Sequence, residues 1–180
     1  MTATLEKSIE KIKLNLGSRD RSLKGFKNMD IDQHPNVDFV GDVKDLSRFQ
    51  DGSISEIYAS HILEHFPHVE TFSVLKEWFR VLSSDGILFL AVPDFKRIVE
   101  IYTKHGMSQL TVNILYGDQI YKTAYHYTCF DVWSLTEMLK KVGFKSISQV
   151  DQFNMGANDC STLCSNMDGR SISLNLVAEK

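Results

Sequence analysis

Short apolar runs alternate with amphipathic helical patterns through the middle of the chain. The run ISEIYA at 54–59 leads into a helical pattern that begins near 61, breaks at Pro67 and resumes over 69–82. The run ILFLAV at 87–92 leads into a second helical pattern over 95–102. Strands that alternate with helices at this spacing predict parallel strands joined by helical crossovers.

Alternating or apolar segments elsewhere predict the remaining strands, at 12–16, 26–31, 37–40, 144–150 and 172–178. We therefore expect a single α/β domain over residues 1–180, built on a mostly parallel, twisted sheet of about seven strands with helices on both faces. The last strand should run antiparallel, as a hairpin with the strand before it. So few residues separate Gly17 from Asp30 that the first crossover helix should be shortened or lost.

Polar signals mark where several elements begin and end. The SSDG segment at 83–86 predicts a turn between a helix and the strand at 87–92. Asp94 precedes the next helical pattern and is expected to cap it. Ser134 with Glu137 forms a capping-box pattern that should open a helix ending at Gly143.

Composition narrows the class of protein. A chain of 180 residues with 43% apolar composition can bury one sizeable core. Its net charge of −3 gives no overall attraction to nucleic acid, although a local basic patch stays open. The longest apolar run is too short to span a bilayer, and the charged start MTATLEKSIEKIK favours a cytoplasmic location. The three cysteines fit reduced thiols, and the Cys160–Cys164 pair fits a loop better than a metal site.

Small and polar residues follow the ends of the expected strands. In parallel sheets the carboxyl ends share one edge, and ligands bind there. The sequence therefore predicts a nucleoside-binding rim, formed by Gly17, Asp30, Asp42, Ser60, His61 and Asp94.

These segments also carry a family resemblance. LNLG, GFKNMDID, VGDVKDL, SHILEH and LKEWFRVLSSDGILFLAVPD occur in that order over residues 13–102, and SLTEMLKKVGF and SISLNLVAEK continue the pattern more weakly. In this the chain resembles the class I S-adenosylmethionine-dependent methyltransferases, in particular the small bacterial type 11 group. The resemblance implies a Rossmann-like fold, S-adenosylmethionine as cofactor and a methyl acceptor as substrate.

The resemblance also implies which residues contact the cofactor. The Asp30 carboxylate would accept hydrogen bonds from the ribose hydroxyls. Asp42 would meet the adenine amino group, with the Val43 backbone beside the ring. The interpretation of Asp30 or Asp42 as an ordinary loop or capping residue stays open.

Three further positions complete the implied cofactor contacts. Gly17 ends the first strand where the backbone would pass close to the cofactor. Asn15 stands where many relatives carry an acid that meets the methionine amino group. Ser60 lies near the point where the methyl group would be presented.

Methyl transfer depends mainly on in-line positioning with water excluded, but an oxygen nucleophile also needs a base. His61 and His126 are the candidates because histidine titrates near neutral pH. His126 lies in the aromatic segment AYHYTCF, where Tyr125 and Tyr127 can wall a pocket for a small-molecule or glycan-like acceptor. The alternatives are a packed loop histidine for His126 and a simple helix start for His61.

Two other functions stay open. Ser18 and Arg19 replace the usual glycine-rich turn, which favours a non-catalytic relative that keeps the fold as a binding or scaffold module. Residues 61–65 spell HxxEH, the inverted zinc-protease signature, and Glu137 could supply its third ligand. Because Pro67 cuts that helix short and the motif follows a strand, we assign no metal from the sequence.

Overall fold

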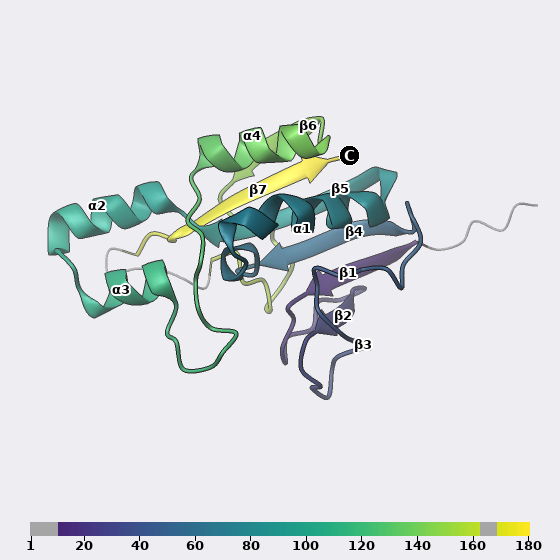
Figure 1. The fold of residues 1–180 in the computed structure, drawn as a ribbon, viewed down its shortest axis with the longest axis horizontal. Helices are drawn as coiled ribbons and strands as arrows, with labels where there is room; N and C mark the ends of the chain where they lie inside the picture. Colours follow the sequence, from purple (N-terminus) through teal and green to yellow (C-terminus); the bar gives the residue numbers. More distant parts are fainter. Residues whose placement is uncertain (1–10, 163–168) are drawn as a thin grey trace, which may run out of the picture.

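The computed structural model describes residues 11–162 and 169–180, so Cys164 lies outside the described residues. A seven-stranded sheet forms the centre of the structure, in the order β3-β2-β1-β4-β5-β7-β6 (Figure 1). Its strands are β1 (Ile12–Leu16), β2 (Lys27–Asp30), β3 (Phe39–Val40), β4 (Ile54–Ser60), β5 (Leu82–Pro93), β6 (Ser146–Val150) and β7 (Ser173–Glu179). The first five pair in parallel, whereas β7 runs antiparallel between β5 and β6. The expected Rossmann-like α/β fold, a mostly parallel sheet of seven strands with an antiparallel final strand, is confirmed.

One face of the sheet is covered by the helices α1 (His68–Val81) and α4 (Val132–Val142). Alternate side chains of the strands point to this face and form the main core with them, including Leu88 and Leu90 of β5. The indole of Trp78, fully buried on α1, donates a hydrogen bond to the Val43 carbonyl 2.8 Å away. Burial of this continuous apolar surface fixes α1 and α4 against the sheet.

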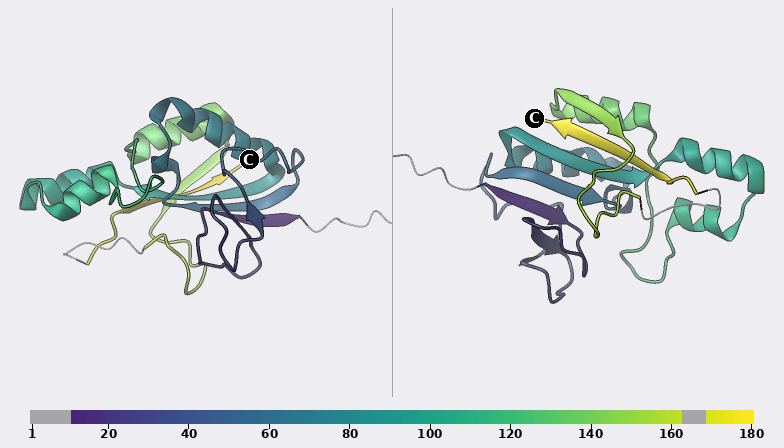
Figure 2. Two further views of the ribbon diagram at one scale, coloured as in Figure 1. Left: turned by 60° about the horizontal axis from the view of Figure 1, so that its bottom comes forward. Right: turned by 180° about the vertical axis from the view of Figure 1, so that it is seen from behind.

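The opposite face is covered by segments without regular structure. Leu23, after β1, and Phe153, after β6, pack there on Tyr58 and Ala91. Figure 2 shows these segments beneath the sheet, with α1 and α4 above it. The first crossover helix is lost, because the link at 17–26 is shorter than the dozen or so residues that a helical crossover needs. This face therefore differs from the helical layer that the sequence analysis expected.

Two more helices extend beyond the carboxyl end of β5 (Figure 1). They are α2 (Phe95–His105) and α3 (Gln109–Tyr116), and their apolar contacts form a separate small cluster. As expected, the Asp94 side chain caps α2, by accepting the Lys96 N–H. The chain then returns through an insert, residues 117–130, toward the carboxyl edge of the sheet. No helix in 11–162 or 169–180 has the length and apolarity needed to cross a membrane.

Two expected boundaries are wrong. The SSDG segment does not separate α1 from β5, because β5 already begins at Leu82 and accommodates these residues through a shift in its pairing with β4. Helix α4 begins at Val132, since Asp131 rather than Ser134 is the N-cap. Asp131 accepts the Ser134 N–H at 2.7 Å and Ser134 Oγ accepts the Asp131 N–H, so Ser134 is the second member of the capping box. Glu137 instead pairs with Lys140.

Candidate functional site

Asp30 ends β2 at the carboxyl edge of the sheet. Its carboxylate is buried and accepts two backbone hydrogen bonds, from the Arg19 N–H at 2.8 Å and from the Asp32 N–H at 3.0 Å. These bonds fix the orientation of the carboxylate and use one acceptor position on each oxygen, which leaves further positions for a hydroxyl-bearing ligand. The next residue, Ile31, is 50% exposed although it is apolar. An exposed apolar side chain beside an oriented acid suits a nucleoside, with its ring on Ile31 and its sugar on Asp30.

Asp42 and Val43 follow β3 on the same edge. Asp42 Oδ1 accepts the Lys44 N–H at 3.0 Å, and Lys44 Nζ lies 3.7 Å from Oδ2. The Val43 carbonyl accepts a hydrogen bond from the Trp78 indole, and this bond fixes the backbone at this point. Asp42 borders a surface hollow of about 340 Å³. The hollow is lined by Met29, Val40, Gly41, Asp42, Asp45, Ser47 and Arg48. Of the predicted cofactor contacts, Asp42 alone lines this hollow.

Gly17 has a structural reason to be glycine. Its φ is +65°, and an added Cβ would lie 1.8 Å from Ile62 Cδ1. The Gly17 N–H donates to the Met29 carbonyl at 2.9 Å, which turns the chain across the end of β2. The close approach at Gly17 is therefore made by the Ile62 side chain, and a cofactor contact at Gly17 stays a prediction.

Asn15 lies in a buried amide network rather than at the open rim. Its Nδ2 donates to the Arg21 carbonyl and to Asn28 Oδ1, each at 3.0 Å. Asn28 in turn donates to Ser22 Oγ and to the Asn36 carbonyl. This network ties the segment after β1 to the sheet. The predicted contact of Asn15 with the methionine amino group stays untested.

Ser60 and His61 lie at the end of β4. Ser60 Oγ is buried and has no hydrogen-bond partner among the described residues. His61 adopts a φ of +57°, a conformation that residues other than glycine rarely take and that is often found at functional sites. Its Nε2 lies 2.9 Å from Ser173 Oγ and its Nδ1 lies 3.3 Å from Glu64 Oε1. Both ring nitrogens therefore have a polar neighbour, and the role of His61 as a base stays a prediction.

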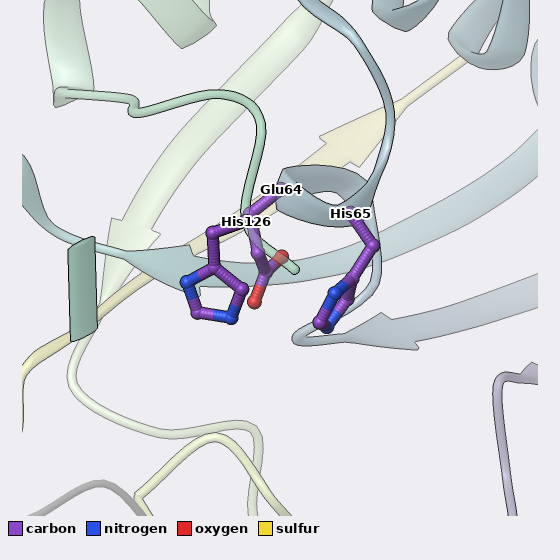
Figure 3. A group of neighbouring side chains, drawn as sticks. All are labelled: Glu64, His65 and His126. Atoms are coloured by element: carbon purple, nitrogen blue, oxygen red, sulfur yellow. The ribbon is translucent and has the colours of Figure 1, made fainter. Parts of the chain in front are cut away.

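The insert brings His126 against the short 3₁₀ helix η1 (Leu63–His65). Tyr127 and Thr128 donate backbone hydrogen bonds to the Glu64 carbonyl, at 2.8 and 3.3 Å. The His65 and His126 rings pack edge to face with their centroids 4.8 Å apart. Figure 3 shows the side chains of Glu64, His65 and His126 converging. The insert thus completes a cluster that no single segment contains.

Charge and burial set the protonation of this cluster. Burial lowers the pKa of His126, although the nearby Glu64 opposes the shift, so His126 is neutral near pH 7. Burial alone would raise the pKa of Glu64, but the attraction of His61, and more weakly of His65 and His126, holds it below the ordinary value. The cluster therefore places a neutral imidazole beside a carboxylate.

The zinc-protease arrangement of the HxxEH motif is not formed. That signature uses both of its histidines as ligands and its glutamate as the base. Here the donor atoms that gather within 4.8 Å of one another come from Glu64, His65 and His126. Glu137, the expected third ligand, is paired with Lys140 at 2.9 Å on the exposed side of α4. Sequence reasoning missed Glu64 and His65 as partners of His126, although the motif itself was the available signal.

The insert also reaches the loop that follows β1. The Arg19 guanidinium lies over the Tyr121 ring, 5.5 Å from its centroid. Tyr125 and Tyr127 stack with centroids 6.2 Å apart, and both are partly exposed. One segment therefore joins the loop after β1 to the cluster at His126 and presents aromatic rings between them.

Comparison with known proteins agrees with this geometry. A family model described as a methyltransferase domain, of the type 11 group, matches residues 17–90. Among curated proteins, no sequence matches the chain. Similar solved structures include a SAM-dependent methyltransferase from Archaeoglobus fulgidus, with a TM-score of 0.62 and 12% identity, covering 94% of this chain and 86% of that one. Another, from Methanosarcina mazei, gives a TM-score of 0.59 at 17% identity over 93% and 91% of the two chains.

One similar structure contains ligands. It is the 1,6-didemethyltoxoflavin-N1-methyltransferase of Burkholderia thailandensis, solved with 1,6-didemethyltoxoflavin and S-adenosylhomocysteine. Its TM-score is 0.56 at 14% identity, over 94% of this chain and 70% of that one. The chain thus has the class I methyltransferase fold. The match of residues 17–90 to a methyltransferase-domain family model agrees with the family resemblance seen in the sequence.

Proposed function

We propose that the protein is an S-adenosylmethionine-dependent methyltransferase that acts on a small-molecule or glycan-like acceptor. The observation that carries the proposal is the pair Asp30 and Ile31 at the end of β2. An oriented, buried carboxylate stands beside an exposed apolar side chain, at the sheet edge where ligands of this fold class bind. The match to a methyltransferase domain and the ligand-bound Burkholderia neighbour support the same choice.

The described residues fit the cofactor in several ways. Asp30 would accept the ribose hydroxyls, Ile31 would contact the adenine ring, and Asp42 would meet the adenine amino group beside the Val43 backbone. Ser60, whose buried hydroxyl has no partner among the described residues, would complete the site toward the methyl group. Bound S-adenosylmethionine supplies an activated methyl group on its sulfonium.

The protein's own residues would then orient the acceptor and handle its proton. Burial keeps His126 neutral near pH 7, and its Nδ1 lies 2.8 Å from the Ile114 carbonyl. Because a carbonyl can only accept, the proton sits on Nδ1 and the lone pair on Nε2. An unprotonated Nε2 can accept a proton from an acceptor hydroxyl or bind a metal ion. The stacked Tyr125 and Tyr127 would contact the flat or ring-shaped face of the acceptor and exclude water.

Calorimetric titration with S-adenosylhomocysteine tests the proposal. We expect saturable binding by the wild-type protein and a loss of at least tenfold in affinity for Asp30→Ala, because the ribose hydroxyls lose a charged acceptor. Ile31→Ala should weaken binding severalfold without unfolding the protein, since Ile31 is exposed. The matched control Asp32→Ala removes an exposed acid two residues away and should leave the affinity within about twofold.

The same titration separates the second candidate function. The missing glycine-rich turn and the filled space at Gly17 favour a relative that keeps the fold without the cofactor. No heat of binding at millimolar S-adenosylhomocysteine would support that scaffold role and reject the methyltransferase. If Asp30→Ala and Asp32→Ala had equal affinities, the assigned cofactor site would be wrong.

A further inference from the structure

The cluster of Glu64, His65 and His126 has the composition of a metal site. One potential donor atom from each residue lies within 4.8 Å of the other two. Figure 3 shows Glu64 and His65 coming from η1 and His126 from the insert that crosses it. The hydrogen bonds from Tyr127 and Thr128 to the Glu64 carbonyl hold these two segments together.

Both histidines are oriented as metal ligands are. His65 Nδ1 lies 3.0 Å from the Tyr125 carbonyl, and His126 Nδ1 lies 2.8 Å from the Ile114 carbonyl. Since a carbonyl only accepts, each Nδ1 carries a proton, so Nε2 is the ring atom that can bind a metal ion. Metal-binding histidines almost always donate their other N–H to such a partner, which fixes the tautomer and the ring orientation.

Glu64 supplies the independent observation. Its side chain is fully buried, yet neither carboxylate oxygen accepts a hydrogen bond from any described residue. On one side Oε1 faces the His61 ring, whose Nδ1 lies 3.3 Å away. Buried carboxylates are ordinarily hydrogen-bonded, paired with a charge or bound to a metal. A cation between Glu64 and the two imidazoles would give this buried carboxylate the bonded partner that it lacks beside the His61 contact.

We propose that Glu64, His65 and His126 bind one first-row divalent metal ion of the zinc, cobalt or manganese type. Two imidazoles and one carboxylate suit these ions better than magnesium or calcium, which prefer oxygen ligands. Three protein ligands leave at least one coordination position open, as in catalytic rather than structural sites.

The open position defines the acceptor more closely, and this step rests on the proposed function. The metal would bind a hydroxyl oxygen of the acceptor and favour loss of its proton to solvent. That oxygen attacks the methyl carbon of S-adenosylmethionine. A carbon–oxygen bond forms while the carbon–sulfur bond breaks, and the bonding pair returns to sulfur to give S-adenosylhomocysteine. The acceptor is then an alcohol, phenol or sugar hydroxyl, and His126 acts as a ligand rather than as the base.

Cobalt titration of the full-length protein, stripped with a chelator, tests the site without any cofactor. We expect one Co²⁺ per chain, with a visible absorption band that Zn²⁺ abolishes by competition. Glu64→Gln keeps the side-chain volume, and His65→Ala truncates a partly exposed ring. Each should weaken binding at least tenfold while the far-ultraviolet circular dichroism stays that of the wild type. His68→Gln is the matched control, because His68 is an exposed histidine on the adjoining helix outside the cluster, and it should bind like the wild type.

The outcomes are separable from those of the cofactor experiment. The metal site would be overturned if the wild-type protein bound less than about 0.2 Co²⁺ per chain at 1 mM Co²⁺, the weak end of useful affinity. Equal Co²⁺ affinities of Glu64→Gln and His68→Gln would overturn it as well. S-adenosylhomocysteine is titrated in parallel into the metal-free protein. Cofactor binding without metal binding would reject this inference and leave the methyltransferase intact. Metal binding without cofactor binding would support the site and reject its role in methyl transfer.

Discussion

Replacing Gly17 by alanine tests the account of the shortened turn after β1. The substitution places a side chain at a φ of +65°, which costs about 1–2 kcal/mol for an L-residue. The new Cβ also falls 1.8 Å from Ile62 Cδ1, so the surroundings must move, at a further cost of about 1–3 kcal/mol. We therefore expect Gly17→Ala to lower the free energy of unfolding by about 3 kcal/mol.

Two further variants separate these contributions. Gly25 has a φ of +84° with nothing within 4 Å of an added Cβ, so Gly25→Ala should show the conformational cost alone, about 1 kcal/mol. Ile62→Ala removes the group that clashes. The double variant Gly17→Ala/Ile62→Ala should therefore lose about 1–3 kcal/mol less free energy of unfolding than the two single variants lose when added together.

Urea unfolding followed by tryptophan fluorescence gives these free energies, since Trp78 is buried and reports on the main core. If Gly17→Ala destabilised no more than Gly25→Ala, the Ile62 contact would not be the reason for glycine at this position. Strict additivity of Gly17→Ala and Ile62→Ala would contradict the reasoning as well. A loss of S-adenosylhomocysteine affinity at unchanged stability would instead indicate that Gly17 serves the cofactor directly.

Two other predictions concern the N-cap of α4 and the loss of folding stability at alkaline pH. Asp131→Ala should lower the free energy of unfolding in urea by about 1 kcal/mol because it removes the N-cap of α4. Glu137→Ala removes only an exposed ion pair and should lower it by at most about 0.5 kcal/mol. Equal losses for the two variants would contradict the cap assignment. Burial raises the pKa of Tyr58, whose hydroxyl donates to Asp159, above its ordinary value of 10.0. The folded state therefore favours the neutral phenol, and its stability should fall as the pH rises above about 10. Tyr58→Phe should flatten this decline in urea midpoints, while the exposed control Tyr102→Phe should leave it unchanged; a decline of equal slope in both variants would refute the assignment.

The sheet was largely predictable because its strands are apolar, short and bounded by polar residues. The seven expected strands all form, and their order places Asp30, Asp42 and Ser60 at one edge. The boundary errors have local causes. β5 extends back through SSDG because neighbouring β4 continues to pair with it, and α4 starts early because Asp131 caps it better than Ser134.

The candidate acceptor side was only partly predictable. His126 was identified from its aromatic surroundings, but its partners depend on how the insert at 117–130 folds back over η1. That segment has no periodicity, so nothing in the sequence fixes its path. The hydrogen bonds that do fix it, such as Tyr127 to the Glu64 carbonyl, join residues far apart in the chain. In the same way, the covering of the second face depends on Phe153 and Leu23 meeting across the sheet.

The most direct test of the central claim is a crystal structure of the protein grown with S-adenosylhomocysteine. The account predicts the ribose hydroxyls within hydrogen-bonding distance of the Asp30 carboxylate and the adenine ring against Ile31. A ligand bound elsewhere, or an Asp30 carboxylate that contacts only the Arg19 and Asp32 backbone in a crystal saturated with the ligand, would contradict it.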